Sequence, residues 1–100
     1  MSYAVSLNAT ADDDLYALHQ WVSSEASPAI ADSYLRRVQA RILTLAEFPE
    51  RGTRRADLPY DMRTLSFERR LLIIYTVSGN EVEVLRVTST ARDIDRLFDA

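Results

Sequence analysis

Arginine is the residue type that could most readily form a functional site in this chain of 100 residues. All twelve basic side chains are arginines, and there is no lysine and no cysteine. A guanidinium offers a planar fork that holds a carboxylate or phosphate at two points, so arginines gathered on one surface make an anion-binding site. Six of them lie in or beside the strand-like segments of the second half: Arg63, Arg69, Arg70, Arg86, Arg92 and Arg96.

Two of these arginines, Arg70 and Arg86, stand at the start and the end of adjacent predicted strands. If they converge with others on one face, the protein has an anion site that suits phosphate or the carboxylates of a partner. Alternatively, the arginines pair with acidic residues close by in the sequence, namely Asp57, Asp61, Glu68, Asp93 and Asp95. The sequence leaves both interpretations open.

Other kinds of catalytic or metal chemistry have little support. The single histidine, His19, lies on a predicted helix without acidic neighbours at metal-ligand spacing, and nothing supports a serine–histidine–aspartate triad. Glu81 and Glu83 share one face of a strand, where a solvated surface is the simpler interpretation. We therefore expect no metal, no cofactor and no catalytic residue of these kinds.

The composition predicts one globular domain spanning residues 1–100. The chain is 47% hydrophobic and has a formal net charge of −3. An acidic chain is a poor candidate for bulk nucleic-acid binding, so no direct contact with nucleic acid is expected. No apolar run reaches the ~20 residues that a membrane span requires, and the N-terminus does not resemble a signal peptide. We expect a soluble cytoplasmic protein with no membrane association.

The first half of the chain predicts a strand followed by two helices. Tyr3–Leu7 is rich in strand formers. Thr10, three residues before Asp13, predicts the start of a helix that ends in the polar stretch Ser23–Ser27. Ser27 then caps a second helix, with Pro28 in its first turn and Pro49 at its end. Its predicted apolar stripe consists of Ile30, Tyr34, Val38, Ile42 and Leu45.

The second half predicts three strands and a terminal helix. Met62–Phe67, Leu71–Val77 and Val82–Val87 are strand-like, with a turn at Ser78-Gly79-Asn80. The middle strand is apolar on both faces, which indicates a central, covered position. Ala91–Ala100 fits a short helix. The order β-α-α-β-β-β-α indicates an α+β fold, in which an antiparallel αα-hairpin packs on a small, mostly antiparallel sheet.

The arginine-rich stretch FPERGTRRADL, Phe48–Leu58, is interpreted as the connector from the hairpin to the sheet. Pro49 stops the helix, and Gly52 is expected to allow a turn that other residues resist. The arginines of the connector are expected to be solvated or to face a partner.

The ordered set of elements and motifs resembles the RelE/ParE toxin superfamily, the toxin half of type II toxin–antitoxin pairs. The resemblance covers nearly the whole chain and includes the connector, MRTLSFERRLLIIYTV and VEVLRVTSTARDI. Its characteristic pieces are an arginine on the strand after the connector, an apolar strand with a tyrosine, and an Arg-Asp pair after the last strand. Here these are Arg63, Tyr75 and Arg92-Asp93.

The resemblance divides into two branches with different activities. RelE-like members resemble ribosome-dependent mRNA endonucleases, which use an arginine three residues before the strand tyrosine, a later arginine and a C-terminal tyrosine or histidine, with lysine assisting. This chain has Leu72 and Phe98 where two of these groups are expected, Ser89 where many members have histidine, and no lysine. Leucine and phenylalanine cannot move protons or stabilise phosphate charge.

These departures favour the ParE-like branch, whose members resemble inhibitors of DNA gyrase without an accepted active site and are associated with plasmid stabilisation. The resemblance also implies a toxin–antitoxin hetero-oligomer with a DNA-binding, ParD-like antitoxin. The candidates for contact with target or partner are Arg63, Arg70, Arg86, Arg92, Asp93, Trp21 and Tyr34. The alternatives are an mRNA endonuclease that uses Arg92 with Arg70 or Arg86, and a non-toxic antitoxin-binding module.

Arg92→Ala is expected to reduce toxicity while leaving the fold intact, because Arg92 follows the last strand in the Arg-Asp pair. Growth arrest on induced expression measures toxicity, and circular dichroism checks folding. A folded Arg92→Ala variant with full toxicity would remove this residue from the site.

Overall fold

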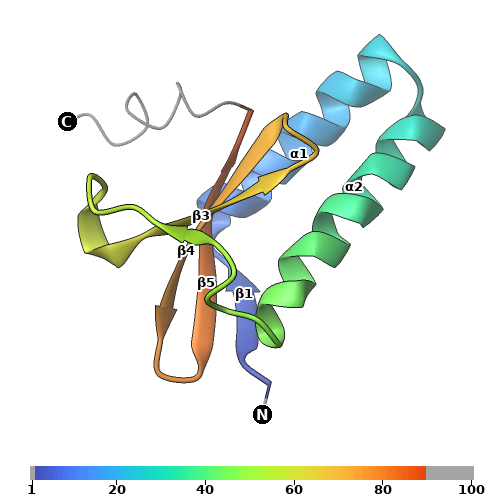
Figure 1. Ribbon diagram of the computed structural model, residues 1–100. Helices are drawn as coiled ribbons and strands as arrows, with labels where there is room; N and C mark the ends of the chain where they lie inside the picture. The colour runs from blue at the N-terminus through green and yellow to red at the C-terminus, as the bar shows by residue number, and fades with distance from the viewer. Residues whose placement is uncertain (1, 90–100) are drawn as a thin grey trace.

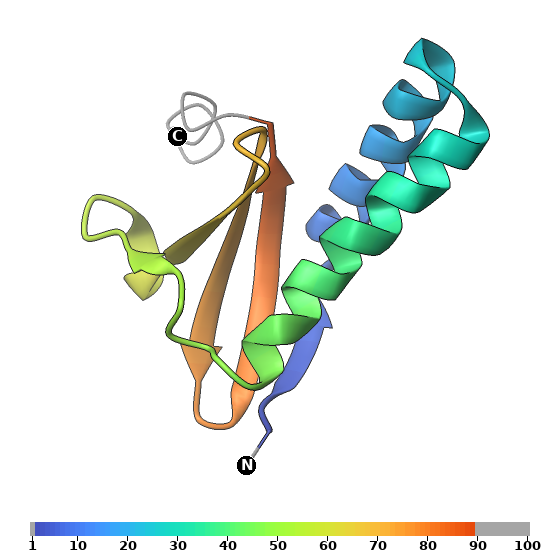
Figure 2. The same ribbon diagram turned by 45° about the vertical axis from the view of Figure 1, so that its right-hand side comes forward.

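The computed structural model describes residues 2–89 as two helices packed on one face of a five-stranded sheet. Strand β1 (Ala4–Leu7) leads into helices α1 (Ala9–Glu25) and α2 (Pro28–Leu43), which form an antiparallel hairpin. Strands β2 (Thr53–Arg54), β3 (Arg63–Phe67), β4 (Leu71–Ser78) and β5 (Glu81–Thr88) follow, together with two 3₁₀ turns, Thr44–Ala46 and Pro59–Asp61. The hairpin lies on one side of the sheet in both views (Figures 1 and 2).

The sheet has the order β1-β5-β4-β3-β2. Only the β1–β5 pair is parallel, and the other three pairs are antiparallel. The predicted α+β class and the mostly antiparallel sheet are therefore confirmed. The predicted terminal helix Ala91–Ala100 lies outside the described residues. The sequence did not predict β2, a two-residue edge strand inside the connector, because so short a strand has no periodicity to read.

Strand β4 occupies the centre of the sheet, as its doubly apolar sequence predicts. Ile73 and Tyr75 belong to the main core beneath the helices, whereas Ile74 belongs to a second cluster on the opposite face. The second cluster is completed by Leu58, at the end of the connector, and by Met62, directly before β3. The connector thus covers the sheet face that the helices leave open, which gives β4 apolar contacts on both sides.

Helix α1 begins earlier than the sequence predicts. Asn8, not Thr10, is the N-cap, since its side-chain oxygen accepts a hydrogen bond from the Ala11 backbone N–H at 2.9 Å. The Asn8 N–H still donates to the carbonyl of Val84, 3.0 Å away, and so continues the hydrogen bonding beyond β1. The chain therefore turns from strand to helix at a single residue, and asparagine suits both roles.

Helix α2 begins as predicted, with the Ser27 hydroxyl accepting from the Ile30 N–H and Pro28 in the first turn. The helix ends at Leu43, six residues before Pro49, and a 3₁₀ turn follows. The carbonyl of Ala46, at the end of this turn, accepts a hydrogen bond from the Tyr3 N–H at the entry to β1. The Phe48 N–H still donates to the Thr44 carbonyl at 3.0 Å, so helical hydrogen bonding stops at the residue before Pro49, as proline requires.

The apolar stripe predicted for α2 is wrong at its first position. Ile30 is 55% exposed, and the buried positions are Ala31, Leu35, Val38, Ile42 and Leu45. The tip of the hairpin projects beyond the end of the sheet (Figure 2), so the first turn of α2 has no strand beneath it. Only the small side chain of Ala31 fits into the contact there, and Ile30 is left on the surface.

The connector is fixed to the sheet by the hydroxyl of Tyr75. This fully buried group donates to the Pro49 carbonyl at 2.8 Å and accepts from the Gly52 N–H at 2.9 Å. A Cβ on residue 52 would lie 2.5 Å from the Tyr75 oxygen. Glycine is therefore required by this close approach and not by a positive φ, which corrects the reason expected from the sequence.

Tyr75→Phe is expected to lower the free energy of unfolding by about 1–3 kcal/mol, because it leaves a buried N–H and a buried carbonyl without partners. Thermal or urea denaturation measures the change. Tyr16→Phe removes the same atom from a ring that is 69% exposed and is the matched control. Equal stability of the two variants would show that the Tyr75 hydroxyl does not hold the connector.

Candidate functional site

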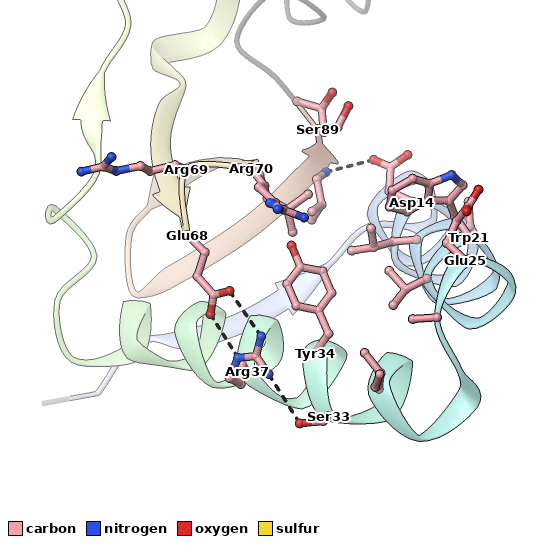
Figure 3. A pocket seen from close by; sticks show the side chains of 18 of the residues that line it. Asp14, Trp21, Glu25, Ser33, Tyr34, Arg37, Glu68, Arg69, Arg70 and Ser89 are labelled. Carbon is pink, nitrogen blue, oxygen red and sulfur yellow. Dashed lines mark hydrogen bonds and ion pairs between the residues drawn. The ribbon is translucent and has the colours of Figure 1, made fainter.

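A groove of about 1260 Å³ opens between the helical hairpin and one end of the sheet (Figure 3). Its helical wall comes from α1 and α2. Its other wall comes from the β3–β4 turn, the first residue of β4 and the last residues of β5. The projecting hairpin creates the groove, because its outer turns face open space where the sheet has ended. Apolar side chains supplied by both walls are Leu18, Trp21, Val22, Ile30, Leu71 and Val87.

The groove brings together four residues that the sequence singled out. Trp21, Tyr34, Arg70 and Arg86 all line it, although they come from four separate segments. Trp21 is 59% exposed, so its indole is available as a contact surface. Arg63 lies elsewhere and donates to the connector carbonyls of Gly52 and Glu50, at 3.0 and 3.3 Å. Arg92 and Asp93 lie outside the described residues.

Arg86 is held by Asp14, a residue that sequence reasoning passed over. The guanidinium donates to both carboxylate oxygens, from Nε at 2.8 Å and from Nη2 at 3.0 Å. The same carboxylate accepts the Val87 N–H at 2.9 Å. Because β1 pairs with β5 only as far as Val84, this N–H has no strand partner, and the Asp14 side chain takes that place. Asp14 thereby joins α1 to the end of β5.

A register shift in β5 accompanies this contact. Ile74 pairs with Arg86 and Tyr75 pairs with Val84, so Leu85 has no partner on β4. The extra residue is a β-bulge, which breaks the alternation of side chains along β5. Val82, Val84 and Val87 can all contribute to the core under the helices. A regular alternation would place residue 87 on the opposite face from residues 82 and 84.

Tyr34 stands in the wall of the groove between two fixed neighbours. Its ring lies 5.9 Å from that of Phe67, and the Arg37 guanidinium lies 5.3 Å from its centroid. Burial raises the pKa of the Tyr34 hydroxyl, and Glu68 adds to this while Arg70 and Arg37 oppose it. The group therefore remains a protonated hydrogen-bond donor at neutral pH.

Glu68 is occupied by Arg37 and does not pair with the arginines beside it in the sequence. Arg37 donates from Nε to one carboxylate oxygen at 3.0 Å and from Nη2 to the other at 3.3 Å. This hydrogen bonding holds the pKa of Glu68 below its usual range. Within residues 2–89, neither Arg69 nor Arg70 forms a salt bridge with a carboxylate.

The turn that carries these charges has an unfavourable backbone. Glu68 and Arg69 have φ angles of 49° and 61°, and the Arg70 N–H closes the turn onto the Phe67 carbonyl at 3.1 Å. Tight turns of this type usually contain Asn-Gly, because positive φ is costly for residues with a long side chain. The other hairpin follows the usual preference, with Gly79 at φ 58°.

Two of the three arginines of the connector form salt bridges nearby, and the third, Arg51, donates to the Thr44 hydroxyl at 3.1 Å, which answers in part the question left open by the sequence. Arg54 pairs with Asp61 and Arg55 pairs with Asp57. The hydrogen bonds from Arg55 lower the pKa of Asp57 to about 2. Asp57, Asp61 and Glu68 thus pair with arginines of the connector and α2. Among the described residues, Arg70 is then left without a salt bridge, and Arg86 pairs with Asp14.

The described residues offer no metal site and no helix that spans a membrane. His19 pairs with Asp32 across the hairpin at 2.7 Å, and residues 2–89 contain no group of three side chains that is suited to hold a metal. Neither α1 nor α2 combines the length and the hydropathy that crossing a bilayer requires.

Sequence reasoning missed Asp14 and Arg37, and it named Glu68 only as a possible partner of arginines close by in the sequence. Asp14 is the third of three consecutive aspartates in the chain. Its signal is weak, since Asp12, Asp13 and Asp14 are equivalent until the helix orientation is known. Arg37 carries no local signal either, because its partner Glu68 lies 31 residues away.

Comparison with known proteins gives a consistent result. Residues 5–94 match the family model described as ParE toxin of type II toxin–antitoxin system, parDE. A structure titled as the chromosomal ParDE TA system from P. aeruginosa aligns with a TM-score of 0.79 and 22% identity, covering 89% of this chain and 97% of that one. A conserved hypothetical protein from Helicobacter pylori aligns with a TM-score of 0.51 and 14% identity, covering 87% and 93%. A search of curated protein sequences finds no match.

Asp14→Asn is expected to lower the free energy of unfolding by about 2 kcal/mol, since it weakens charge-assisted hydrogen bonds to a partly buried guanidinium. Amide exchange at Val87 should accelerate as well. Asp13→Asn changes an exposed neighbour in the same turn and is the control. The joining role of Asp14 would be refuted by two variants of equal stability and unchanged exchange at Val87.

Proposed function

Because the chain belongs to the ParE toxin family of type II toxin–antitoxin systems, we propose that it inhibits DNA gyrase and that a cognate antitoxin neutralises it. The family match spans residues 5–94 and is the observation that carries the proposal. The action requires protein–protein contact and no chemistry by the toxin itself. The protein would act in the cytoplasm, where gyrase works on DNA.

The surroundings of the candidate catalytic positions support inhibition over RNA cleavage. Leu72, which stands where RelE-like enzymes carry an arginine, packs against the second apolar cluster. Arg70 lies in the turn before β4 and not on that strand. Arg86 has two of its nitrogens engaged by Asp14. In-line attack by a 2′-hydroxyl requires a proton acceptor and free cationic donors. Leu72 can supply neither, and Arg86 is already engaged by Asp14.

The groove is the surface proposed for the antitoxin. The solved relative is a ParDE toxin–antitoxin system by its title. A partly apolar groove with exposed Trp21 and Ile30 matches the way in which an amphipathic segment docks. Aromatic and arginine side chains are the usual centres of binding energy in such interfaces. The antitoxin is expected to be ParD-like and DNA-binding, and the assembly to be a toxin–antitoxin hetero-oligomer.

An mRNA endonuclease remains the alternative function. One observation favours it: Tyr34 and Arg70 line the same groove. A phenol and an unpaired guanidinium are groups that RNA cleavage can use. A further alternative is a non-toxic antitoxin-binding module. These possibilities differ in the target that the protein disables.

Purified protein is expected to abolish supercoiling by gyrase with accumulation of linear DNA, while a defined mRNA on translating ribosomes stays intact. Gel analysis of plasmid topology and primer extension on the message are the two measurements. A cleaved message with unaffected gyrase would reverse the assignment. Inactivity in both assays, together with normal growth during expression, would support the non-toxic module.

A further inference from the structure

Arg70 is an exposed cation turned into an apolar groove without a carboxylate partner. Figure 3 shows its side chain directed toward the Tyr34 hydroxyl, whereas the Arg69 side chain points away. No described carboxylate forms a salt bridge with Arg70, and Glu68, its nearest acidic neighbour in the sequence, has both oxygens engaged by Arg37. The guanidinium therefore presents donors to the groove that the described chain leaves unused.

The Tyr34 hydroxyl is the second unused donor. It makes no hydrogen bond within residues 2–89 and lies in the wall of the groove, where a ligand can reach it. The contacts of its ring with Phe67 and Arg37 fix its orientation, so the hydroxyl is carried to the side of the groove on which Arg70 lies. The Arg70 guanidinium and the Tyr34 hydroxyl, which come from different elements, thus both face the groove.

The β3–β4 turn, which positions Arg70, has an energetically unfavourable backbone conformation. The positive φ angles of Glu68 and Arg69 are each unfavourable by roughly 1 kcal/mol relative to a turn built with glycine. The turn directs Glu68 to Arg37 and Arg70 into the groove. Strain of this kind concentrates where a protein binds something, and here it accompanies the two unused donors.

We propose that Arg70 and the Tyr34 hydroxyl form a carboxylate-binding subsite, which receives one aspartate or glutamate of an otherwise apolar segment of the antitoxin. The proposal rests on the antitoxin binding proposed above and specifies its chemistry. The carboxylate accepts hydrogen bonds from the guanidinium and the phenol, while neighbouring apolar side chains of the segment cover Trp21 and Ile30. The subsite fixes the register of the segment, because only one position along it can carry the acid.

A carboxylate fits this subsite better than a phosphate does. Asp14 and Glu68 stand in the same groove and, although paired, would repel the row of phosphodiester anions along a nucleic-acid backbone more than a single carboxylate. The apolar surface of Trp21, Leu71 and Val87 also favours a segment with a single charge. Arg70 and Arg86 are not equivalent here, since Arg86 already holds Asp14.

The test begins with a displayed library of random 12-residue peptides, selected for binding to the full chain. Trp21 is the only tryptophan of the protein and lies in the groove, so its fluorescence reports occupancy directly. We expect the selected peptides to share one aspartate or glutamate among apolar residues. Changing that acid to its amide should weaken binding roughly tenfold or more, as expected for a charge-assisted hydrogen bond.

The variants Arg70→Gln and Tyr34→Phe identify the atoms involved. Each is expected to weaken binding of the acidic peptide several-fold to tenfold, and Arg70→Gln should cause no further loss with the amide peptide. Arg69→Gln, which removes the same charge one residue away, is the matched control and should bind normally. Thermal denaturation shows whether each variant is folded, and Arg70→Lys separates the fork geometry from charge alone.

Four results would overturn the subsite. These are no enriched peptide, enriched peptides without a carboxylate, equal losses for Arg69→Gln and Arg70→Gln, or displacement of the peptide by a 12-nucleotide RNA in an Arg70-dependent manner. The last would assign the groove to phosphate. Because none of these measurements uses gyrase, an inactive toxin with an intact subsite refutes the proposed function alone. An active toxin that lacks acid selectivity refutes only the subsite.

Discussion

The buried hydroxyl of Tyr75 is the contact on which the arrangement of layers depends. The tyrosine stands on the central strand, yet its two hydrogen bonds go to the segment that leaves the helices. That segment must be pinned before it can cover the far face of the sheet with Leu58 and Met62. The same contact demands glycine at position 52, and Arg63 reinforces it through the Gly52 carbonyl. A single side chain therefore connects the helical layer, the connector and both apolar clusters.

A second contact between the layers lies at the opposite end of the sheet, where Asp14 joins α1 to the last residues of β5. With the hairpin fixed at both places, its tip extends past the strands and leaves the groove (Figures 2 and 3). The groove is thus a consequence of a mismatch in position and not in length. The 17 residues of α1 and the eight residues of β4 or β5 each span about 25 Å, so the tip projects because the hairpin is displaced along the sheet (Figure 2). Exposed Trp21 and Ile30 are the apolar surface that this mismatch leaves without cover.

The charges around the groove divide into those that build it and those that remain available. Asp14 with Arg86 and Arg37 with Glu68 are structural pairs, and both bridge elements distant in sequence. Exposed salt bridges such as Arg37–Glu68 add little stability by themselves. The main effect of this salt bridge is therefore to orient the β3–β4 turn. Arg70 is left over from this pairing. A protein of net charge −3 thereby presents a cation in an apolar groove. Such a charge contributes more to the choice of binding partner than to the strength of binding.

The sequence by itself determined the order of the two helices and of strands β1, β3, β4 and β5, the α+β class, the central position of Leu71–Val77 and the cap at Ser27, because each follows from local periodicity or turn chemistry. It also singled out Trp21, Tyr34, Arg70 and Arg86. It misplaced the first cap, where Asn8 also donates to Val84 far along the chain, and the end of α2, where a 3₁₀ turn follows Leu43. Only the tertiary structure decided that those four residues share a groove, that Asp14 and Glu68 neutralise their partners, and that Arg70 forms no salt bridge within residues 2–89. Pairing across 31 to 73 residues depends on how the layers pack, and no local pattern records it.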